Sequence, residues 1–357
     1  MCEKRCRSTP AGASRPRPSP RCSRDVGARV SDAPIRLGTR RSALATAQSQ
    51  QVADALAAAS GRPVELVLIT SEGDVSRASL SELGGRGVFA TRLREALLAG
   101  ECDVLVHSLK DLPTAPAPGL VIAATPPRED PRDVVVTRTG VPLHELAPGS
   151  VVGTGSPRRI AQVRRRNPRV EVRDIRGNID SRIGRVRLGE LDAVILAAAG
   201  LARLGGSLHD LHLEPLGLAE WPTAPGQGVL AVEIREDASA DLADAVAALD
   251  DRRARVEITA ERAVLAGLDS GCQAPVGVHA EFDGHELRVR TVVYAPGGGD
   301  RIGDDRAIPL ISGYAGEKGS GDGADAADRA DPVARAERTG TVIARDLLDR
   351  GAAGLAT

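Results

Sequence analysis

The feature that most constrains the fold of this chain is the alternation of short apolar segments with helical segments along its first two thirds. Strands are predicted at 35–37, 64–70, 103–107 and 120–124, and then at 134–137, 151–152, 170–175 and 193–197. Helices are predicted between them at 43–59, 88–99, 157–166 and 179–188. Strands that alternate with helices form parallel sheets wrapped by helices, which bind ligands at the carboxyl ends of their strands. The sequence therefore predicts an α/β fold, with a Pro- and charge-rich hinge at 125–133 between the two runs.

A long loop in the first run and a third region after the second run complete this outline. The polar loop 71–87 is long for a compact domain, and loops of that length usually have a function. The segment 64–70 is almost continuously apolar, which is typical of a strand covered on both faces. From about Asp250 onward we expect a helix at 253–266, a hairpin of strands 276–282 and 286–294, and a closing helix at 339–350. The stretch 296–335 is rich in Gly, Asp and Ala and is predicted to be a flexible insertion.

The N-terminal residues 1–33 have a different composition. They are rich in Arg, Pro and Ser, so we expect them to be disordered, and they lack the apolar region of a secretory signal. Three interpretations remain open, a transit peptide, a dispensable extension or a misplaced start codon, and the last two are favoured. No stretch of the chain approaches the roughly 20 apolar residues of a membrane helix. We expect a cytoplasmic protein that does not bind membranes.

Aromatic residues and cysteines exclude several classes of site. Two Phe, two Tyr and one Trp leave a core built from Ala, Val, Leu and Ile, and they disfavour single-stranded nucleic acid, which binds by stacking on aromatic rings. The five cysteines have no CxxC pattern, so neither a disulfide framework nor a metal site is expected.

Arginine is concentrated in one part of the chain. Between residues 158 and 187 there are 11 arginines, opposed by only three acidic residues. Arginine binds carboxylate and phosphate groups with two parallel hydrogen bonds. A solvated basic helix face is the simpler interpretation, and it fits Arg164, Arg165 and Arg166 at the end of a predicted helix. It fits less well for the arginines at loops and helix starts.

Three predicted strands end in arginine or hydroxyl residues that also lie at a helix start. These ends are 38–42, 153–159 and 176–178. Free backbone N–H groups at a helix start favour anions, so the combination predicts an anion site. Ser42 and Ser156 are also good N-caps, but capping does not require arginines. The GTGS segment lacks the spacing of a dinucleotide or phosphate-binding loop, so a nucleotide is a weak interpretation.

Two further positions could carry chemistry. Lys110 and Asp111 follow an apolar strand, and a carboxylate among cations stays ionised. Asp111 could stabilise a developing cation or move a proton, or it could form a structural ion pair with an arginine; both readings remain open. Cys272 lies in a glycine-flanked turn, whereas Cys102 lies in an apolar run. An accessible thiol can be a nucleophile or an attachment point, but from the residues alone an inert loop cysteine is favoured.

Together these segments resemble the hydroxymethylbilane synthase (porphobilinogen deaminase) family. The matching strings are GTRRSALA (38–45), GGRGVF (84–89), HSLKDLP (107–113), REDPRD (128–133), GTGSPRR (153–159), IRGNIDSR (175–182), DAVILAAAGLARLG (192–205), APGQG (224–228), TAERA (259–263) and GCQAPVG (271–277). They follow the family's order from residue 35 to 294. Departures are the extra residues 1–33, the long 296–335 segment, and Glu82 and Arg86 where the family often has lysine.

The resemblance implies the fold and the domains. It implies two lobes like those of periplasmic ligand-binding proteins, with parallel-type sheets and the active-site cleft between them, and a small third α/β domain that carries the cofactor cysteine. The implied boundaries are 1–33 for the disordered extension, 34–126 with 228–246 for domain 1, 132–221 for domain 2, and 249–357 for domain 3.

The resemblance also implies the activity and its residues. Four porphobilinogen molecules condense stepwise, with release of ammonia, into the linear tetrapyrrole hydroxymethylbilane on a dipyrromethane cofactor joined by a thioether to Cys272, and Asp111 is the implied catalytic residue. The implied cofactor-binding residues besides Cys272 are Lys110, Asp111, Thr154, Ser156, Arg158, Arg159 and Arg182. The implied substrate-binding residues are Arg40, Ser42, Arg176, Gly177, Arg182 and Arg203. A monomer that passes its product to uroporphyrinogen-III synthase is expected.

Two alternatives remain beside this reading. A non-catalytic anion-binding protein of the same two-lobed fold would explain the arginines but not Cys272 or the Lys110–Asp111 pair. A nucleic-acid-binding protein would use the basic run, but the scarcity of aromatic residues and the interrupted charge pattern disfavour it.

Overall fold

The computed structural model describes residues 33–70, 88–206, 208–269, 275–310 and 331–355. These residues all belong to one compact unit, Asp32–Thr357. Three predictions lie outside them, namely the disordered extension up to residue 32, the loop 71–87 and the turn that contains Cys272.

The first lobe is a mixed five-stranded sheet. Its strands are β1 (Ile35–Arg40), β2 (Val64–Ile69), β3 (Val104–Ser108), β4 (Leu120–Ala124) and β10 (Leu230–Arg235), in the order β2-β1-β3-β10-β4. Strands β2, β1 and β3 are parallel, whereas β10 runs antiparallel to both β3 and β4. The helices of this lobe are α1 (Ala43–Ser60), α3 (Val88–Leu98) and α7 (Ala240–Ala247). Apolar residues of α1, α7 and the sheet form its core, including Val52, Leu56 and Val246.

The second lobe has the same arrangement. Its strands are β5 (Asp133–Thr137), β6 (Val151–Gly153), β7 (Glu171–Arg173), β8 (Ala193–Ala197) and β9 (His212–Pro215), in the order β7-β6-β8-β5-β9. Here β5 is the strand that runs antiparallel to both of its neighbours. The helices are α4 (Pro157–Arg166), α5 (Ile179–Arg187) and α6 (Ala198–Leu204).

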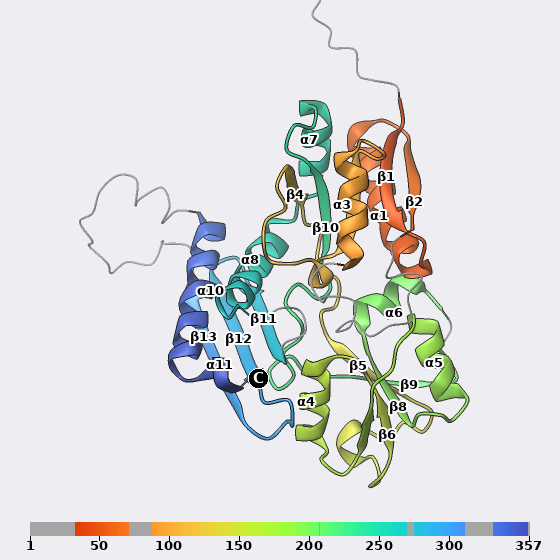
Figure 1. The fold of residues 1–357 in the computed structure, drawn as a ribbon, viewed down its shortest axis with the longest axis vertical. Helices are drawn as coiled ribbons and strands as arrows, with labels where there is room; N and C mark the ends of the chain where they lie inside the picture. Colours follow the sequence, from red (N-terminus) through yellow and green to blue (C-terminus); the bar gives the residue numbers. More distant parts are fainter. Residues whose placement is uncertain (1–32, 71–87, 207, 270–274, 311–330, 356–357) are drawn as a thin grey trace, which may run out of the picture. The chain divides into compact units, whose positions relative to one another are not determined.

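The chain passes between the two lobes twice. It leaves the first sheet after β4 and enters the second through its antiparallel strand β5; it then returns after β9 to add β10 beside β4 (Figure 1). We call residues 125–132 the first crossover and residues 216–229 the second crossover. Each antiparallel strand therefore follows a crossover directly, so residues at the start of β5 and just before β10 lie where the two lobes are joined.

The third domain packs two helices on an antiparallel sheet. The sheet order is β11-β12-β13, with β11 at Val276–Phe282, β12 at Glu286–Tyr294 and β13 at Arg301–Pro309. Helix α8 (Arg252–Gly267) packs against β11 and against α10 (Pro332–Asp349), as Figure 1 shows, and the short α11 (Ala352–Leu355) follows. Three sheets in two lobes and a small α/β domain confirm the predicted fold class.

Several details differ from the sequence predictions. The prediction of a flexible insertion over 296–335 is wrong for Arg301–Pro309, which pairs with β12 along its whole length. The closing helix begins at Pro332, seven residues earlier than predicted, with Asp331 as its N-cap. Strand β2 is covered only in part: Leu66 and Ile69 pack into hydrophobic cores on its two faces, whereas Leu68 is 46% exposed. The prediction also lacked α6, β9, β10 and α7.

Candidate active site

The turn after β3 directs two neighbouring side chains to different surroundings. Leu109 is fully buried and fixes a short 3₁₀ turn, Leu109–Asp111, at the carboxyl end of the strand. Lys110 reaches inward, and its Nζ donates to Oε1 of the buried Gln227 at 3.3 Å. Asp111 is exposed, and no arginine of the described residues forms an ion pair with it. The reading of Asp111 as a structural ion pair therefore has no support in the described part of the chain.

Lys110 is held in surroundings that disfavour its charge. Burial, helped by the charges of Arg159 and Arg158, lowers the pKa of Lys110 to about 8, although Asp111 and Asp133 oppose the shift. An anion bound beside the ammonium would reverse this effect, because an opposite charge favours the protonated form.

Arg158 and Arg159 point into the lobe from the first turn of α4. Pro157 opens this helix and Ser156 caps it, accepting from Arg159 N. Both arginines are buried, and both contact the carboxylate of Asp133: Arg158 Nη1 lies 2.9 Å from Oδ2, and Arg159 Nη2 lies 2.6 Å from Oδ1. Burial alone would raise the pKa of Asp133, but the two guanidinium charges hold it well below its usual range.

We call Lys110, Arg158 and Arg159 the cation cluster. Among the described residues near this cluster, Asp133 is the only acid that is fully buried. Three basic side chains therefore face one buried carboxylate, so positive charge is in excess. The Nε atoms of Arg158 and Arg159 are also buried without a hydrogen-bond partner among the described residues. Buried charges and N–H groups without partners are costly, so the cluster fits an anionic ligand that supplies several carboxylate oxygens.

The predicted residues of α5 lie close to this cluster. Asn178 caps α5, and Arg182 Nε donates to the carbonyl of Gly177 at 2.8 Å. Burial, followed by the charges of Arg159 and Arg176, lowers the pKa of Arg182, which places these three cations in one electrostatic environment. Gly177 has a φ of 108°, and a Cβ there would lie 2.2 Å from Ser181 Oγ. Only glycine fits this turn.

Thr154 and Ser156 occupy the segment between β6 and α4. Thr154 is fully buried, and its Oγ1 accepts from Ser156 N at 3.3 Å. Ser156 is half-buried and caps α4. Both hydroxyl groups therefore shape the start of the helix that carries Arg158 and Arg159.

On the first lobe, Arg40 and Ser42 lie at the end of β1. Ser42 caps α1 by accepting from Ala45 N at 3.3 Å. Because β1 and β3 are parallel neighbours, their carboxyl ends lie at the same edge of the sheet. Arg40, Ser42 and the Lys110–Asp111 turn are thus brought to one edge.

Arg203 is the predicted residue that the structure does not connect to the others. It lies on α6, and its Nη2 donates to the carbonyl of Gly228 on the second crossover at 2.8 Å. It lines a cavity of about 380 Å³ together with residues of α1 and the first crossover, such as Val52 and Pro126.

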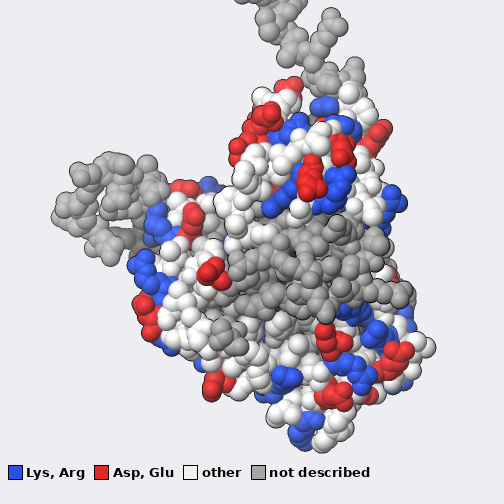
Figure 2. All heavy atoms as spheres, in the orientation of Figure 1, with Lys and Arg blue, Asp and Glu red and all other residues white. Residues whose placement is uncertain are grey.

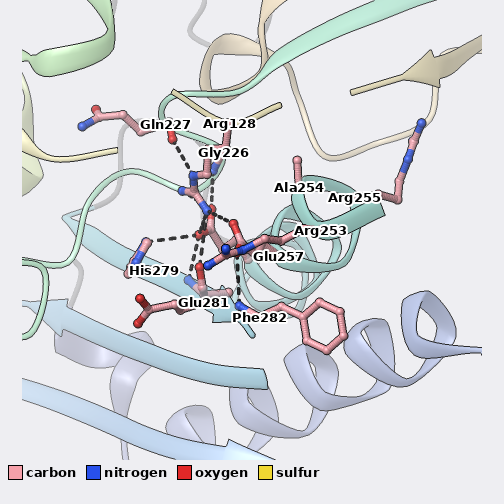
Figure 3. Close-up of polar contacts among 12 residues, drawn as sticks. Arg128, Gly226, Gln227, Arg253, Ala254, Arg255, Glu257, His279, Glu281 and Phe282 are labelled. Atoms are coloured by element: carbon pink, nitrogen blue, oxygen red, sulfur yellow. Dashed lines mark hydrogen bonds and ion pairs between the residues drawn. The ribbon is translucent and has the colours of Figure 1, made fainter. Parts of the chain in front are cut away.

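A second buried network joins the third domain to both crossovers (Figure 3). Arg128 of the first crossover pairs with Glu261 of α8 at 2.8 Å and with Glu257 at 3.3 Å. Glu261 also accepts from Gly226 N at 2.6 Å and from Ala280 N at 2.8 Å. The domain that carries Cys272 is therefore attached to the segments where the lobes are joined.

The exposed arginines follow the solvated interpretation only in part. Arg164, Arg165 and Arg166 are exposed, and Arg166 pairs with Glu220. Two of them also contact the third domain, because Arg164 Nη1 donates to the carbonyl of Pro296 at 3.1 Å and Arg165 Nη1 donates to that of Gly299 at 3.4 Å. On the face shown in Figure 2, basic and acidic side chains are interspersed rather than collected in one basic patch. Acids also pair with exposed arginines elsewhere, as Asp210 does with Arg187 at 2.7 Å.

Two residues of this site were missed by sequence reasoning. Asp133, at the start of β5, and Gln227, on the second crossover, contact the cation cluster; they lie in the matched strings REDPRD and APGQG. The signal was present, but nothing local in the sequence assigned a role to either residue. Among the described residues there is no group of His, Cys, Asp or Glu that could hold a metal ion, and no helix is long and apolar enough to cross a membrane.

Comparison with known proteins finds one family that matches most of the chain. Residues 35–243 match the family model described as "Porphobilinogen deaminase, dipyromethane cofactor binding domain", and residues 255–308 match "Porphobilinogen deaminase, C-terminal domain". Porphobilinogen deaminase of Leifsonia xyli is 53% identical over 283 residues, covering 76% of this chain and 85% of the relative. That of Thermobifida fusca is 45% identical over 324 residues, covering 90% and 96%.

The chain also has a distant likeness to a solved binding protein. The methionine binding protein MetQ has a TM-score of 0.39 and 15% identity, covering 60% of this chain and 89% of that chain. A score this low carries no conclusion about function.

Proposed function

The chain belongs to the porphobilinogen deaminase family, and on this premise we propose how its residues divide the work of the reaction. The activity is that of a hydroxymethylbilane synthase, a transferase that condenses four porphobilinogen molecules stepwise into hydroxymethylbilane with release of ammonia. The cofactor of the family is dipyrromethane. The relatives do not favour the alternative of a non-catalytic anion-binding protein.

The observation that carries the proposal is the excess of buried positive charge beside an exposed carboxylate. Each pyrrole unit brings two carboxylates, an acetate and a propionate, so the cofactor and the growing chain are polyanions. The cation cluster offers them charged donors in a place where few water molecules compete. Asp111 lies next to the cluster in the sequence and remains accessible to a substrate.

We assign the cofactor to the cation cluster, Arg182, Thr154 and Ser156, with Cys272 as its covalent attachment. Bound there, dipyrromethane supplies a tethered pyrrole to which the first substrate is joined. Tethering replaces a bimolecular encounter by an oriented, intramolecular one. In the best-oriented cases this lowers the activation free energy by about 7–11 kcal/mol. Arg40, Ser42, Arg176, Gly177 and Arg182 are assigned to the substrate.

Asp111 has a separate role in this assignment. When the aminomethyl C–N bond of porphobilinogen breaks, the nitrogen leaves as ammonia and positive charge develops on the pyrrole. An ionised carboxylate facing the pyrrole nitrogen stabilises that charge. After the new C–C bond forms, the acceptor carbon loses a proton, which a carboxylate can accept.

Arg203 is proposed only indirectly as a substrate residue. Its contact with Gly228 and its place on the cavity lining support a role at the join between the lobes. The monomeric state, the cytoplasmic location, the absence of nucleic-acid partners and the transfer of product to uroporphyrinogen-III synthase stay predictions.

The experiment that tests the proposed function is intact-mass measurement of the purified protein together with assay on porphobilinogen. We expect a mass above that of the sequence by one dipyrromethane, and consumption of porphobilinogen with release of ammonia. A protein with the bare sequence mass and no turnover after incubation with porphobilinogen would contradict the proposal.

Neighbouring arginines on α4 are expected to differ in function. Arg159→Leu removes a charge-assisted partner of a bound carboxylate, which costs roughly 1.5–3 kcal/mol per contact. The variant should stall, and mass spectrometry should detect enzyme that retains one, two or three added pyrroles. Arg165→Leu, on the exposed end of the same helix, loses only a long, exposed hydrogen bond to the carbonyl of Gly299 (3.4 Å), so it should change stability by no more than about 0.5 kcal/mol and leave turnover unchanged. If both variants stalled equally, the proposed difference in function between Arg159 and Arg165 would be contradicted.

The lowered pKa of Lys110 predicts a pH dependence. The ammonium form attracts carboxylates, and in the cofactor-free protein it is lost as the pH rises through about 8. We therefore expect the rate at which cofactor-free protein acquires its dipyrromethane from porphobilinogen to fall above this pH, because the carboxylates then meet an uncharged amine. In Lys110→Arg the guanidinium stays protonated, so this part of the fall should disappear. Both proteins are measured with the same substrate, so titration of porphobilinogen itself is common to both profiles. If the pH profiles of the parent and of Lys110→Arg coincide, protonation of Lys110 does not control the measured rate.

A further inference from the structure

We propose that Asp133 is a positioning residue for this reaction, whose carboxylate orients Arg158 and Arg159 so that their remaining N–H groups meet the carboxylates of the bound pyrroles. The inference rests on the proposed function, which assigns the two arginines to the cofactor. It adds a residue to which no role was assigned by the sequence.

Four donors saturate the carboxylate of Asp133. Oδ1 accepts from Arg159 Nη2 at 2.6 Å and from Gln227 Nε2 at 2.8 Å. Oδ2 accepts from Arg158 Nη1 at 2.9 Å and from Trp221 Nε1 at 2.9 Å. These donors come from α4 and from the second crossover, so the fully buried carboxylate is fixed from two sides. A group held in this way can fix the direction of the arginines that it contacts.

Each arginine gives Asp133 only one nitrogen. Arg158 also uses Nη1 for Gln162 Oε1 at 2.6 Å, and Arg159 uses Nη1 for the carbonyl of Ile195 at 3.0 Å. The Nε atoms of both arginines have no partner among the described residues, although they are buried. The arginines are thus held end-on, and part of each donor fork is left without an acceptor.

Another buried acid of the chain shows the contrasting geometry. Glu233 is 1% exposed, and Arg94 contacts Oε2 through Nε at 3.1 Å and Oε1 through Nη2 at 2.8 Å, with His107 Nε2 3.2 Å from Oε2. That two-pronged arrangement is the one by which a single arginine best neutralises a buried carboxylate. Asp133 instead divides its oxygens between two arginines and neutralises neither fully. This difference supports orientation, rather than charge compensation alone, as the role of Asp133.

Gln227 connects Asp133 to the first lobe. Its Nε2 donates to Asp133, while its Oε1 accepts from Lys110 Nζ at 3.3 Å and lies 3.5 Å from Arg159 Nη2. Lys110 is the neighbour of Asp111 on the same turn. The orientation of the arginines and the placement of the Lys110 ammonium are therefore linked through one side chain.

The test begins with Asp133→Asn, which keeps the size and removes the charge. Three quantities are measured: the fraction of molecules with the dipyrromethane mass, the thermal midpoint of that loaded form and of a cofactor-free Cys272→Ser form, and turnover per loaded molecule. We expect turnover per loaded molecule to fall about 10- to 100-fold, as for loss of a charged hydrogen bond. We also expect the cofactor to raise the midpoint more than in the parent, because only the cofactor then neutralises the cations. Parental turnover per loaded molecule would overturn the inference.

Two further variants separate position from stability and charge. Glu233→Gln removes an equally buried acid, so it should lower the midpoint while leaving turnover per loaded molecule unchanged; an equal loss there would reduce Asp133 to a general stabilising residue and overturn the inference. Asp133→Asn combined with Gln227→Glu returns a carboxylate beside Arg159 from a different direction. The double variant should regain stability but not turnover, and full recovery of turnover would also overturn the inference. If Asp133→Asn does not fold, turnover per loaded molecule of the double variant tests the inference in its place.

Arg159→Leu separates this inference from the proposed function. If Arg159→Leu loads its cofactor and turns over normally, the assignment of the arginines to the cofactor fails. If Arg159→Leu is impaired while Asp133→Asn is normal, the proposed function stands and only the positioning role fails.

Discussion

Replacement of Asp111 by Asn is expected to lower kcat at least about 100-fold, the range typical for loss of a charge-stabilising or proton-transferring group. The substitution keeps the size of the side chain and removes its charge. Asp111 is exposed and forms no ion pair with the described arginines, so the fold should not depend on it. The cation cluster is untouched, and the variant should therefore still carry its cofactor. Release of ammonia from porphobilinogen measures the rate, and intact mass verifies the cofactor.

The control for this prediction is Asp210→Asn. Asp210 is a surface carboxylate paired with Arg187 at 2.7 Å, and neither residue is among the assigned site residues. Exposed pairs of this kind contribute at most about 1 kcal/mol, so turnover should not change. Near-normal turnover of the Asp111 variant would leave this carboxylate without a catalytic role.

The local elements could be predicted because their signals are local. Ser156 and Pro157 marked the start of α4, and the structure begins that helix at Pro157 and ends it at Arg166, as predicted. The strands Leu120–Ala124, Ala193–Ala197 and Val276–Phe282 also have their predicted bounds. Asp331 and Pro332 carry the same kind of start signal for α10, but the surrounding Gly- and Asp-rich composition outweighed it in the prediction.

The order of the strands could not be predicted from those signals. Strand β10 inserts between β3 and β4, although the whole second lobe separates it from them in the sequence. The alternation of strands and helices predicts parallel neighbours, whereas β10 and β5 are antiparallel because each follows a crossover. Pairing of this kind depends on contacts between distant segments, which a local pattern does not contain.

The same limit applies to the candidate site. The sequence separated Arg158 and Arg159 from Arg164–Arg166, and the first pair is buried whereas the second group is exposed. It could not show that the first pair meets Asp133, because that contact joins the start of α4 to the start of β5. Nor could it show that Lys110 turns inward and Asp111 outward, since burial of Leu109 decides the direction of that turn.

Replacement of Cys272 by Ser is expected to give a protein with no dipyrromethane mass and no turnover. A thioether requires the sulfur, and a serine hydroxyl is a far weaker nucleophile than a thiolate. Without the covalent anion, the excess charge of the cation cluster is uncompensated, so we also expect a lower thermal midpoint than that of the loaded protein.

Cys102 provides the matched control, because its thiol is the opposite of what attachment needs. It is fully buried between β3 and α3, and burial raises its pKa to about 11, so the reactive thiolate is scarce. Cys102→Ala should therefore lose some stability through the space left in the core, but it should keep the dipyrromethane mass and the turnover of each loaded molecule. If Cys272→Ser retained the mass increment, the attachment would lie elsewhere. The increment should disappear in Cys272→Ser and persist in Cys102→Ala, because the buried Cys102 thiol is rarely ionised and is closed to an incoming pyrrole.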